Sequence, residues 1–379
     1  GGLPPTTLSN GFNFSTSGTP CTPQTIGTYP ASCFAGVTIF TWDPNDRPAV
    51  SNQWNFTIQH QFGDSTTLQV GYVGQKNTHL MVPVNASQGL LTAPGVVQPS
   101  PYLAGNPTLL AEAPTDKLTN TTGVQSYNAL QVVLQHRLAN GLEFQANYTW
   151  SKCLTDSLGY YGLYANAQNA ADQSGGNYFY YQNTYNAHAD YGPCFYDVTH
   201  LVSGFVTYDL PFGRNRTFGK NVNGVVNAVL GDWQVNSIFT FHSGFPFTIS
   251  APDESGTGSF DSRANCIAPP VVFGEQKSPL GGYQWFSQAS YAPETQGSFG
   301  TCGVGTVRGP GLHTVDLSLS KRFYVTEHQN LEFRAEAINF TNTPILAGPG
   351  SSENSVTTLG RITNSQGARN LQFGLKYNF

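Results

Sequence analysis

Acid-base chemistry needs titratable side chains held close together, and the chain offers one such pair in the segment "YDVTH". Asp197 and His200 are a carboxylate and an imidazole only three positions apart. In an extended strand, residues three apart lie on opposite faces, so the two side chains point away from each other. No nucleophile motif, phosphate loop or paired acid site accompanies them. The sequence therefore predicts no enzyme, and a polar contact at a strand end explains this pair better.

Charged residues also recur on one face of several alternating segments. Glu332, Arg334 and Glu336 share a face, and we expect Asp316 and Lys376 to share one on neighbouring strands. Clustered carboxylates in an enzyme would indicate acid-base catalysis. Along the polar face of a wall, mixed charges instead form a ladder in contact with water, and we favour that interpretation. The charges expected on this face are Arg137, Glu143, Asp316, Glu332, Arg334, Glu336 and Lys376.

Six cysteines lie in segments rich in Gly, Pro and Asn. Taken in order they form three local pairs, Cys21 with Cys33, Cys153 with Cys194, and Cys266 with Cys302. Six cysteines allow 15 pairings, so this assignment comes from shared segments and not from the count. Six scattered buried thiols are the alternative. No CxxC motif or His/Cys cluster is present, and we expect neither a metal nor a cofactor.

One long segment, "YYGLYANAQNAADQSGGNYFYYQNTYN", concentrates aromatic residues among Asn and Gln. Such side chains can stack on sugars or peptides and form hydrogen bonds with them, so this loop is the candidate for ligand contact. Packing of the loop on itself is the competing explanation, because Tyr buries a large area while keeping a polar tip. The candidates are Tyr160, Tyr161, Tyr164, Tyr178, Phe179, Tyr180, Tyr181 and Tyr185.

The composition limits what the 379 residues can form. The 41 Gly and 24 Pro interrupt the sequence too often for long helices. Charged residues make up only 10%, against roughly 25% in ordinary soluble domains. The net charge of -5 argues against nucleic acid as a partner. No apolar run reaches 18 residues. Because "GGLPPTTLSN" lacks a Met and an apolar core, we expect the N-terminus to be a cut in a longer protein.

Nine segments alternate apolar and polar residues with the period of a β-strand. In the last one Leu371, Phe373, Leu375, Tyr377 and Phe379 fall on one face. Seven of the nine segments are 9 or 10 residues long, the length of a tilted strand that crosses a bilayer. Strands of soluble sandwiches average 5 to 6 residues. The segments are 54–62, 67–72, 126–138, 142–150, 201–210, 233–241, 315–323, 331–340 and 370–379.

Connections between these segments are alternately short and long, with 211–232 as an exception of intermediate length. Short turns on one rim and long loops on the other are typical of an outer-membrane barrel. The sequence thus predicts an all-β fold, an antiparallel transmembrane β-barrel portion of about nine long strands, with short periplasmic turns, long extracellular loops and outer-membrane lipid as a partner. Residues 1–50 are expected in an extracellular loop and 51–379 in the C-terminal part of the barrel. Bacterial barrels have even strand numbers, so nine strands indicate a fragment.

The turn in "RLANGLEF" presents a conflict between two signals. Asn-Gly normally forms a two-residue type I′ turn, which would pair Leu138 with Glu143 and mix the two faces. A three-residue loop from Ala139 to Gly141 instead pairs Leu138 with Leu142, Gln135 with Gln145 and Leu134 with Ala146. We therefore expect the three-residue loop, with Gly141 at positive φ.

Several segments, in this order, resemble the C-terminal part of TonB-dependent outer-membrane receptors of the Oar-like type. The resemblance covers nearly the whole chain and rests on "YNALQVVLQHRLANGLEFQANYTWSK", "YDVTHLVSGFVTYDLPFG", "GDWQVNSIFTFHSGFPFTIS", "GSFGTCGVGTVRGPGLHTVDLSLSKRF" and "LEFRAEAINFTNTP". It implies a bacterial outer-membrane location and a 22-stranded barrel. About 13 strands, the N-terminal plug and the TonB-contacting segment would then be absent. It also implies that Tyr377 and Phe379 are read by the barrel assembly machinery.

Two classes of function follow from this resemblance and from the long loops. The first is energy-coupled uptake of a bulky nutrient, such as a siderophore, an oligosaccharide or a peptide. The second is a surface-structural or adhesive barrel that acts through its extracellular loops. A plug and a TonB-contacting segment upstream would favour the first.

Overall fold

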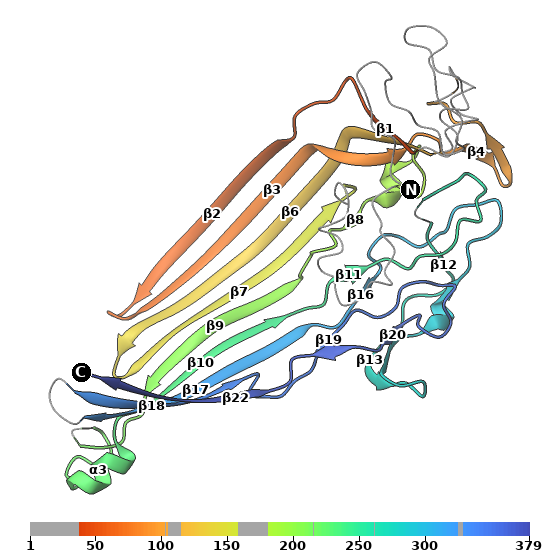
Figure 1. Ribbon diagram of the computed structural model, residues 1–379. Helices are drawn as coiled ribbons and strands as arrows, with labels where there is room; N and C mark the ends of the chain where they lie inside the picture. Colours follow the sequence, from red (N-terminus) through yellow and green to blue (C-terminus); the bar gives the residue numbers. More distant parts are fainter. Residues whose placement is uncertain are drawn as a thin grey trace, which may run out of the picture.

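One broad curved antiparallel sheet, which we call the wall, dominates the computed structural model, and folded loops cover one end of it (Figure 1). The structure describes residues 38–102, 104, 115–157, 181–214, 216–260, 262–324 and 329–379. Nine long strands follow one another across the wall in chain order. They are β2 (Val50–Phe62), β3 (Thr66–Asn85), β6 (Thr115–Ala139), β7 (Leu142–Thr155), β9 (His200–Asp209), β10 (Trp233–His242), β17 (Leu312–Tyr324), β18 (Asn330–Ile338) and β22 (Asn370–Asn378).

These nine strands confirm the all-β fold class expected from the alternating segments. β3 and β6 reach 20 and 25 residues, longer than expected, because both continue past the membrane-facing rows into the loop end. Two short strands join the same sheet: β1 (Thr38–Trp42) lies parallel to β6, and β8 (Gly192–Pro193) pairs with β7. Within the described ranges, no helix is long and apolar enough to cross a membrane.

The register separates two faces of the wall. Leu68, Leu134 and Ala146 are opposite one another on β3, β6 and β7, whereas their neighbours Gln135 and Gln145 pair on the other face. The first set belongs to what we call the outer face, which is rich in exposed aromatic and aliphatic side chains. No second sheet covers it among the described strands. Lipid is the medium in which such a row is stable, as the alternation predicts.

A close aromatic contact reinforces the outer face near β2. The Trp54 indole lies over Gly74 of β3, and a Cβ at that glycine would come within 2.2 Å of Trp54 Nε1. A larger residue at position 74 would therefore displace the Trp54 ring, which accounts for a glycine inside a long strand.

Short connections lie at the end of the wall near the C-terminus (Figure 1). Residues 63–65 join β2 to β3, and Asn140 with Gly141 joins β6 to β7. The connection between β9 and β10 is longer and contains the helix α3 (Gly224–Leu230), whose N-cap Asn223 accepts a hydrogen bond from Val226 N at 2.9 Å. This end is the periplasmic rim of the barrel.

The turn at Asn140 corrects one prediction and confirms another. Asn140 and Gly141 have φ angles of 52° and 83°, and Ala139 pairs with Leu142, so the turn is the two-residue type and the expected three-residue loop is wrong. The register beyond it is nevertheless as predicted, with Gln135 opposite Gln145. A bulge reconciles the two, because Arg137 and Leu138 of β6 together face Glu143. Positive φ at Gly141 is confirmed.

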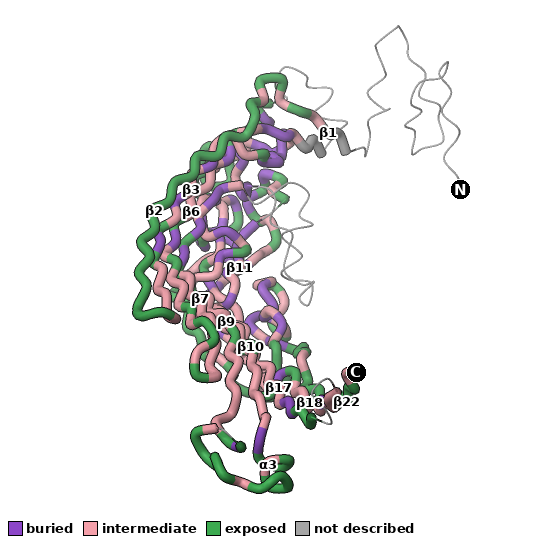
Figure 2. The backbone as a smooth tube through the Cα atoms, turned by 90° about the vertical axis from the view of Figure 1, so that its left-hand side faces the viewer, coloured by how far each residue is buried: buried purple, intermediate pink, exposed green. Residues whose placement is uncertain are grey.

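The loops at the extracellular end form a packed layer with its own core, which we call the loop layer. Figure 2 shows buried residues gathered there, while β2 and α3 are exposed along their length. Its main cluster contains Ile249, Phe286 and Val307, and a smaller one contains Val82 and Val84. Its short elements are β4 (Leu90–Ala93), β5 (Val96–Gln98), η2 (Ala187–Asp190), β11 (Pro246–Phe247), β12 (Asn265–Cys266), β13 (Val272–Lys277), β14 (Tyr283–Phe286), η3 (Gln288–Ser290), β15 (Tyr291–Ala292), β16 (Val307–Arg308), β19 (Ile345–Leu346), β20 (Arg361–Ile362) and β21 (Ser365–Gln366).

Candidate functional site

The inner face of the wall is mostly polar, and Phe205 and Ile238 are apolar side chains in the row of Gln145. The register aligns Asn147 of β7, Ser203 of β9 and Thr240 of β10 in one row across the sheet. Neighbouring amides bond along the strands, as Gln145 Nε2 donates to Asn147 Oδ1 at 3.0 Å and Asn236 Nδ2 to Gln234 Oε1 at 3.3 Å. Such groups bind water and hydroxyl-rich or amide-rich solutes without requiring a fixed charge.

Four charges of the inner face, Arg322, Glu332, Arg334 and Lys376, lie together near the periplasmic rim. Glu332 accepts a hydrogen bond from Arg334 Nε at 2.5 Å, and Arg322 Nε lies 3.8 Å from its other carboxylate oxygen. Lys376 of β22 is directly opposite Glu332. The expected adjacency of Asp316 and Lys376 is wrong, because β18 lies between their strands. Asp316 instead accepts a hydrogen bond from Asn339 N at 2.7 Å.

Arg137 and Glu143 occupy the bulge beside the Asn140 turn, and Glu336 is opposite Ser318 and Gln372. A role for these charges in contact with a plug stays a prediction.

Asp197 and His200 form separate contacts. Asp197 is buried, accepts a hydrogen bond from Cys153 N at 2.7 Å, and forms an ion pair with Arg308. His200 Nδ1 lies 3.0 Å from the Tyr148 hydroxyl and the two rings stack. Asp197 therefore fastens the 194–199 segment to the wall and to the 308 region, which is the structural role expected of a polar contact at a strand end.

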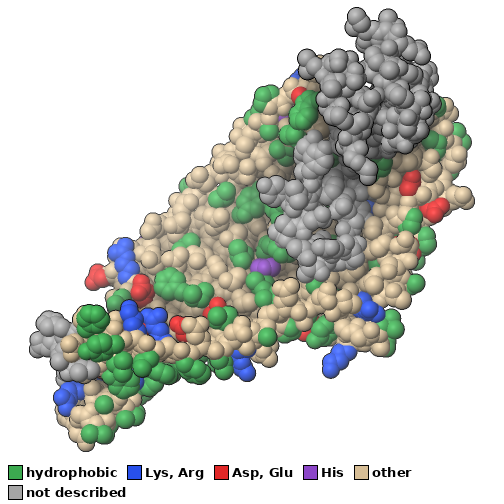
Figure 3. All heavy atoms as spheres, in the orientation of Figure 1, with side chains coloured by type: hydrophobic (Ala, Val, Ile, Leu, Met, Phe, Trp, Pro, Cys, Tyr) green, Lys and Arg blue, Asp and Glu red, His purple; other side chains and the backbone are tan. Residues whose placement is uncertain are grey.

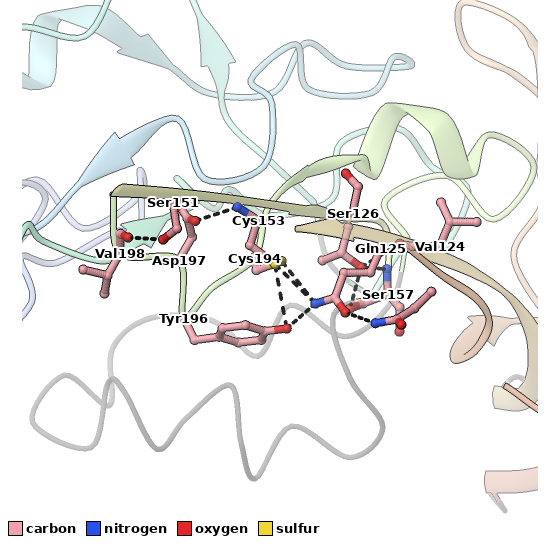
Figure 4. The surroundings of a disulfide bond; sticks show 12 residues. Val124, Gln125, Ser126, Ser151, Cys153, Ser157, Cys194, Tyr196, Asp197 and Val198 are labelled. Carbon is pink, nitrogen blue, oxygen red and sulfur yellow. Dashed lines mark hydrogen bonds between the residues drawn. A yellow bond between two sulfur atoms is a disulfide. The ribbon is translucent and has the colours of Figure 1, made fainter. Parts of the chain in front are cut away.

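Two disulfides lie in the loop layer and match two of the expected pairs. Cys153 and Cys194 have Cα atoms 5.4 Å apart, and Cys266 and Cys302 have Cα atoms 4.8 Å apart. Figure 4 shows the first bond at the end of β7, where Gln125 Nε2 lies 3.3 Å from Cys153 Sγ and also donates to the Tyr196 hydroxyl. Cys21 and Cys33 lie outside the described residues.

A buried ion pair joins two loops that are distant in sequence. Arg263 and Asp190 have side chains 3% and 2% exposed and are directly bonded. Arg263 Nε also donates to Cys302 O at 2.7 Å, which links the pair to the second disulfide. Burial raises the pKa of Asp190, although the Arg263 guanidinium opposes that shift. The sequence contained no signal for this pair, because the partners are 73 residues apart in dissimilar loops.

Two of the aromatic ligand-contact candidates are described. Tyr181 is 2% exposed and packs against Val82 and Val84, and burial raises its pKa. Tyr185 donates a hydrogen bond to Gln88 O and stacks on Tyr102 at 6.0 Å. Both side chains thus form packing contacts within the loop layer. Ligand contact stays a prediction for the set, and the other six, Tyr160, Tyr161, Tyr164, Tyr178, Phe179 and Tyr180, lie outside the described residues.

A cavity of about 310 Å³ lies where the loop layer meets the inner face of the wall. Its walls come from β10, β17 and β19, with His242, Leu312 and Ile345 among the lining side chains. That volume is at the lower end of the range for small-molecule sites. Sequence reasoning missed this cavity, since its residues come from both ends of the β10–β17 connection and from the β18–β22 connection. The part of the chain described here contains no group of three or more potential metal ligands.

Tyr377 and Phe379, the predicted assembly signal, stack with ring centroids 6.1 Å apart at the end of β22. Both rings are on the outer face, in the same row as Leu375. The structure thus exposes them toward lipid, while recognition by the assembly machinery stays a prediction.

Comparison with solved structures finds large outer-membrane proteins of low identity. The outer membrane transporter YddB from Escherichia coli is 9% identical with a TM-score of 0.42, and the alignment covers 88% of this chain and 33% of that one. The FrpB iron transporter from Neisseria meningitidis is 9% identical with a TM-score of 0.39, covering 90% and 33%. The ferripyoverdine receptor of Pseudomonas aeruginosa is 10% identical with a TM-score of 0.41, covering 95% and 30%.

The chain thus spans about a third of the length of the solved structures it matches. No curated protein matches its sequence. The family described as the outer membrane beta barrel domain matches residues 1–372, nearly all of the chain. That match agrees with the wall of long antiparallel strands and with its apolar outer face. The chain belongs to the outer membrane beta barrel domain family, and its location is the bacterial outer membrane.

Proposed function

We propose that this chain is the wall and loop portion of a TonB-dependent receptor barrel for energy-coupled uptake of a bulky nutrient. A siderophore, an oligosaccharide or a peptide fits the chemistry. The observation that carries the proposal is the mostly polar inner face, which leads from the cavity under the loop layer toward the charged periplasmic rim. A passage lined mainly by Asn, Gln, Ser and Thr offers hydrogen bonds to large solutes without requiring a fixed charge on them.

The placement of the loops supports uptake over adhesion. Gln88 Nε2 donates to Gln182 O at 2.7 Å, and Gln182 Nε2 to Gly300 O at 3.0 Å, so three loops are bonded into one layer. The layer meets the inner face around the cavity, where His242 and Leu312 of the wall lie beside Ile345 of the layer. Loops arranged for adhesion alone would not need to cover the lumen. A surface-structural or adhesive barrel is the alternative, and the two disulfides are compatible with it.

In this proposal residues 1–50 belong to an extracellular loop, and residues 51–379 form the C-terminal part of the barrel. Among the described strands, β2 and β22 each have one hydrogen-bonded neighbour in the sheet, and their other edges would pair with strands outside this chain. TonB would act through an N-terminal plug outside this chain. The barrel assembly machinery would bind the edge of β22 with Tyr377 and Phe379.

Gene deletion in the source bacterium tests the proposal. We expect the deletion strain to lose growth on one nutrient in a panel of ferric siderophores, oligosaccharides and peptides supplied at limiting concentration. Restoring the gene should restore growth only when TonB is functional. Unchanged growth on the whole panel, together with loss of surface attachment, would replace uptake by the adhesive alternative.

A further inference from the structure

The connection between β9 and β10 exposes more apolar surface than a turn requires. It spans residues 210–232, whereas β6 and β7 are joined by two residues. Phe218, Val225, Val229 and Leu230 within it are each more than half exposed. Figure 3 shows green side chains gathered around this segment and along β22 at the same end of the molecule. Water is a poor solvent for such a surface, so another phase or partner must cover it.

The same connection is basic. Residues 210–232 contain Arg214, Arg216 and Lys220 against one acidic residue, Asp232. Arg216 Nη2 lies 3.9 Å from an Asp209 carboxylate oxygen, with both side chains substantially exposed. Arg214 and Lys220 are also exposed. Apolar side chains combined with basic ones are typical of segments that lie in the interface of an anionic membrane.

Two contacts fix α3 to the lipid side of the wall. Trp233 Nε1 donates to Val229 O at 2.9 Å, and Lys321 Nζ donates to Gly231 O. Trp233 and Lys321 are opposite each other in the outer-face row next to Val235 and Leu319. Lys321 Nζ also lies 5.0 Å from the centroid of the Trp233 ring. Figure 1 shows α3 beyond the periplasmic ends of β9 and β10.

We propose that residues 211–231 form an interfacial anchor that inserts the apolar side chains of α3 into the periplasmic leaflet. Arg214 and Lys220 bind the phosphate groups of anionic phospholipids there. The surface continues the lipid-facing row through Trp233 and has the charge opposite to that of the lipid. The inference depends on the outer-membrane location and is independent of the proposed uptake.

A spin label tests whether α3 is in lipid. The full-length protein carrying Val225→Cys would be labelled under non-reducing conditions and placed in vesicles of phosphatidylethanolamine and phosphatidylglycerol. Val356→Cys is the matched control, because Val356 is 73% exposed and Val225 is 78% exposed, but Val356 lies in the loop layer. We expect the label at 225 to be relaxed by oxygen and protected from a water-soluble nickel chelate, and the label at 356 to show the reverse. Equal chelate accessibility at both positions would overturn the anchor.

The basic residues give a second readout. Each basic side chain near an anionic surface contributes about a fivefold factor to binding at that surface. Arg214→Gln with Lys220→Gln should therefore lower the ratio of immersed to water-exposed label by more than tenfold in phosphatidylglycerol vesicles, and little in phosphatidylcholine. Lys277→Gln, an exposed change in β13, should have no effect. Lipid-independent behaviour would contradict the role of the charges. Dipolar coupling between labels at 225 on different molecules would identify a second copy as the partner and overturn the lipid assignment.

Discussion

The outer face of the wall exposes large apolar side chains, whereas the loop layer buries side chains of the same types. Phe373 and Ile58 of the wall are 70% and 60% exposed, while Phe286 and Ile249 of the loop layer are completely buried. Lipid supplies the missing contacts of the first pair, and the protein itself supplies those of the second. In the wall, apolar side chains are therefore in contact with lipid, whereas in the loop layer they are packed in a protein core.

This difference determines how each region is stabilised. Strands of the wall are held by backbone ladders between neighbours in chain order, with side chains directed to lipid or to the lumen. The loop layer depends on pairs that are distant in sequence, such as Gln88 with Gln182 and Asp190 with Arg263. Removing one partner in the loop layer leaves a buried polar group, which is costly. The same kind of change on the lumen side of the wall leaves a group in water.

The largest expected effect is at the buried ion pair. Arg263→Met leaves the Asp190 carboxylate buried without its partner, so we expect the loop layer to lose about 3 to 5 kcal/mol. Hydrogen exchange of the loop amides in nanodiscs measures this loss, and amides of β6 and β7 should keep their protection. Arg369→Met, at an exposed arginine, should change loop protection by less than about 0.5 kcal/mol.

A double change distinguishes the lost charge pair from lost packing. Arg263→Met combined with Asp190→Leu removes both charges, and replacing a buried pair by apolar groups is often nearly neutral. The double variant should therefore regain most of the hydrogen-exchange protection that Arg263→Met loses in the loop layer. A double variant as unstable as the single one would show that packing, and not the uncompensated carboxylate, dominates.

Removing the second disulfide should destabilise the loop layer without affecting the wall. Cys266→Ser with Cys302→Ser opens a loop whose ends are 36 residues apart, and we expect the loop layer to lose about 2 to 4 kcal/mol. Limited proteolysis of the membrane-embedded protein should then cut between 250 and 310 while the strands stay intact. Simultaneous loss of the strands would mean that wall and loop layer unfold as one unit.

The wall could be predicted from the sequence because its contacts are local. Alternation gives the face of each residue, and short turns give the neighbouring strand, so Gln135 was correctly placed opposite Gln145. The length of the turn was not correctly predicted. A two-residue Asn-Gly turn combined with a bulge at Arg137 satisfies both the dipeptide preference and the alternation of apolar and polar residues. The adjacency of Asp316 and Lys376 was wrong because pattern gives the face and not the strand order.

Contacts in the loop layer could be predicted only where the type of a residue indicates which residue it pairs with. Cysteines do so, and the 153–194 and 266–302 pairs were found from shared segments. Arg263 and Asp190 resemble ordinary surface charges, and His242 with Ile345 have no periodic context, so neither the ion pair nor the cavity could be inferred. Their positions depend on how long connections cross above the wall.

Adjacent valines on β6 test the two faces at constant side-chain type. Val132 faces outward, opposite Val70 and Tyr148, and Val133 faces inward, opposite Gln69 and Asn147. Val132→Arg should cost about 2 to 4 kcal/mol, because a charge near the bilayer midplane is poorly solvated. Val133→Arg should reduce the free energy of unfolding much less, because the new charge faces the lumen. Urea unfolding in lipid vesicles measures both, and equal costs would contradict the assignment of the faces.

The smallest expected effect is a dependence of the loop layer on pH. Burial raises the pKa of Glu294, and the Asp253 carboxylate raises it further. Burial likewise raises the pKa of Asp190 and of Asp156. A carboxyl group with a raised pKa binds its proton more tightly in the folded layer than in the unfolded chain. This contribution to stability is fully present below the ordinary carboxyl pKa and is lost as pH rises through the raised values.

Hydrogen exchange of the loop amides at pH 5 and pH 7.5, corrected for intrinsic rates, measures this slope. We expect stronger protection at pH 5. Glu294→Gln should flatten part of the slope, because the amide keeps an oxygen that can accept from Gly300 N, at present 2.8 Å from Glu294 Oε1, but cannot ionise. Protection that increases with pH would mean that ion pairs such as Arg263 with Asp190 outweigh carboxylate burial. Attraction between charges would then stabilise the loop layer. The loop layer would differ from the wall mainly in its electrostatic interactions and less in the exclusion of solvent from its core.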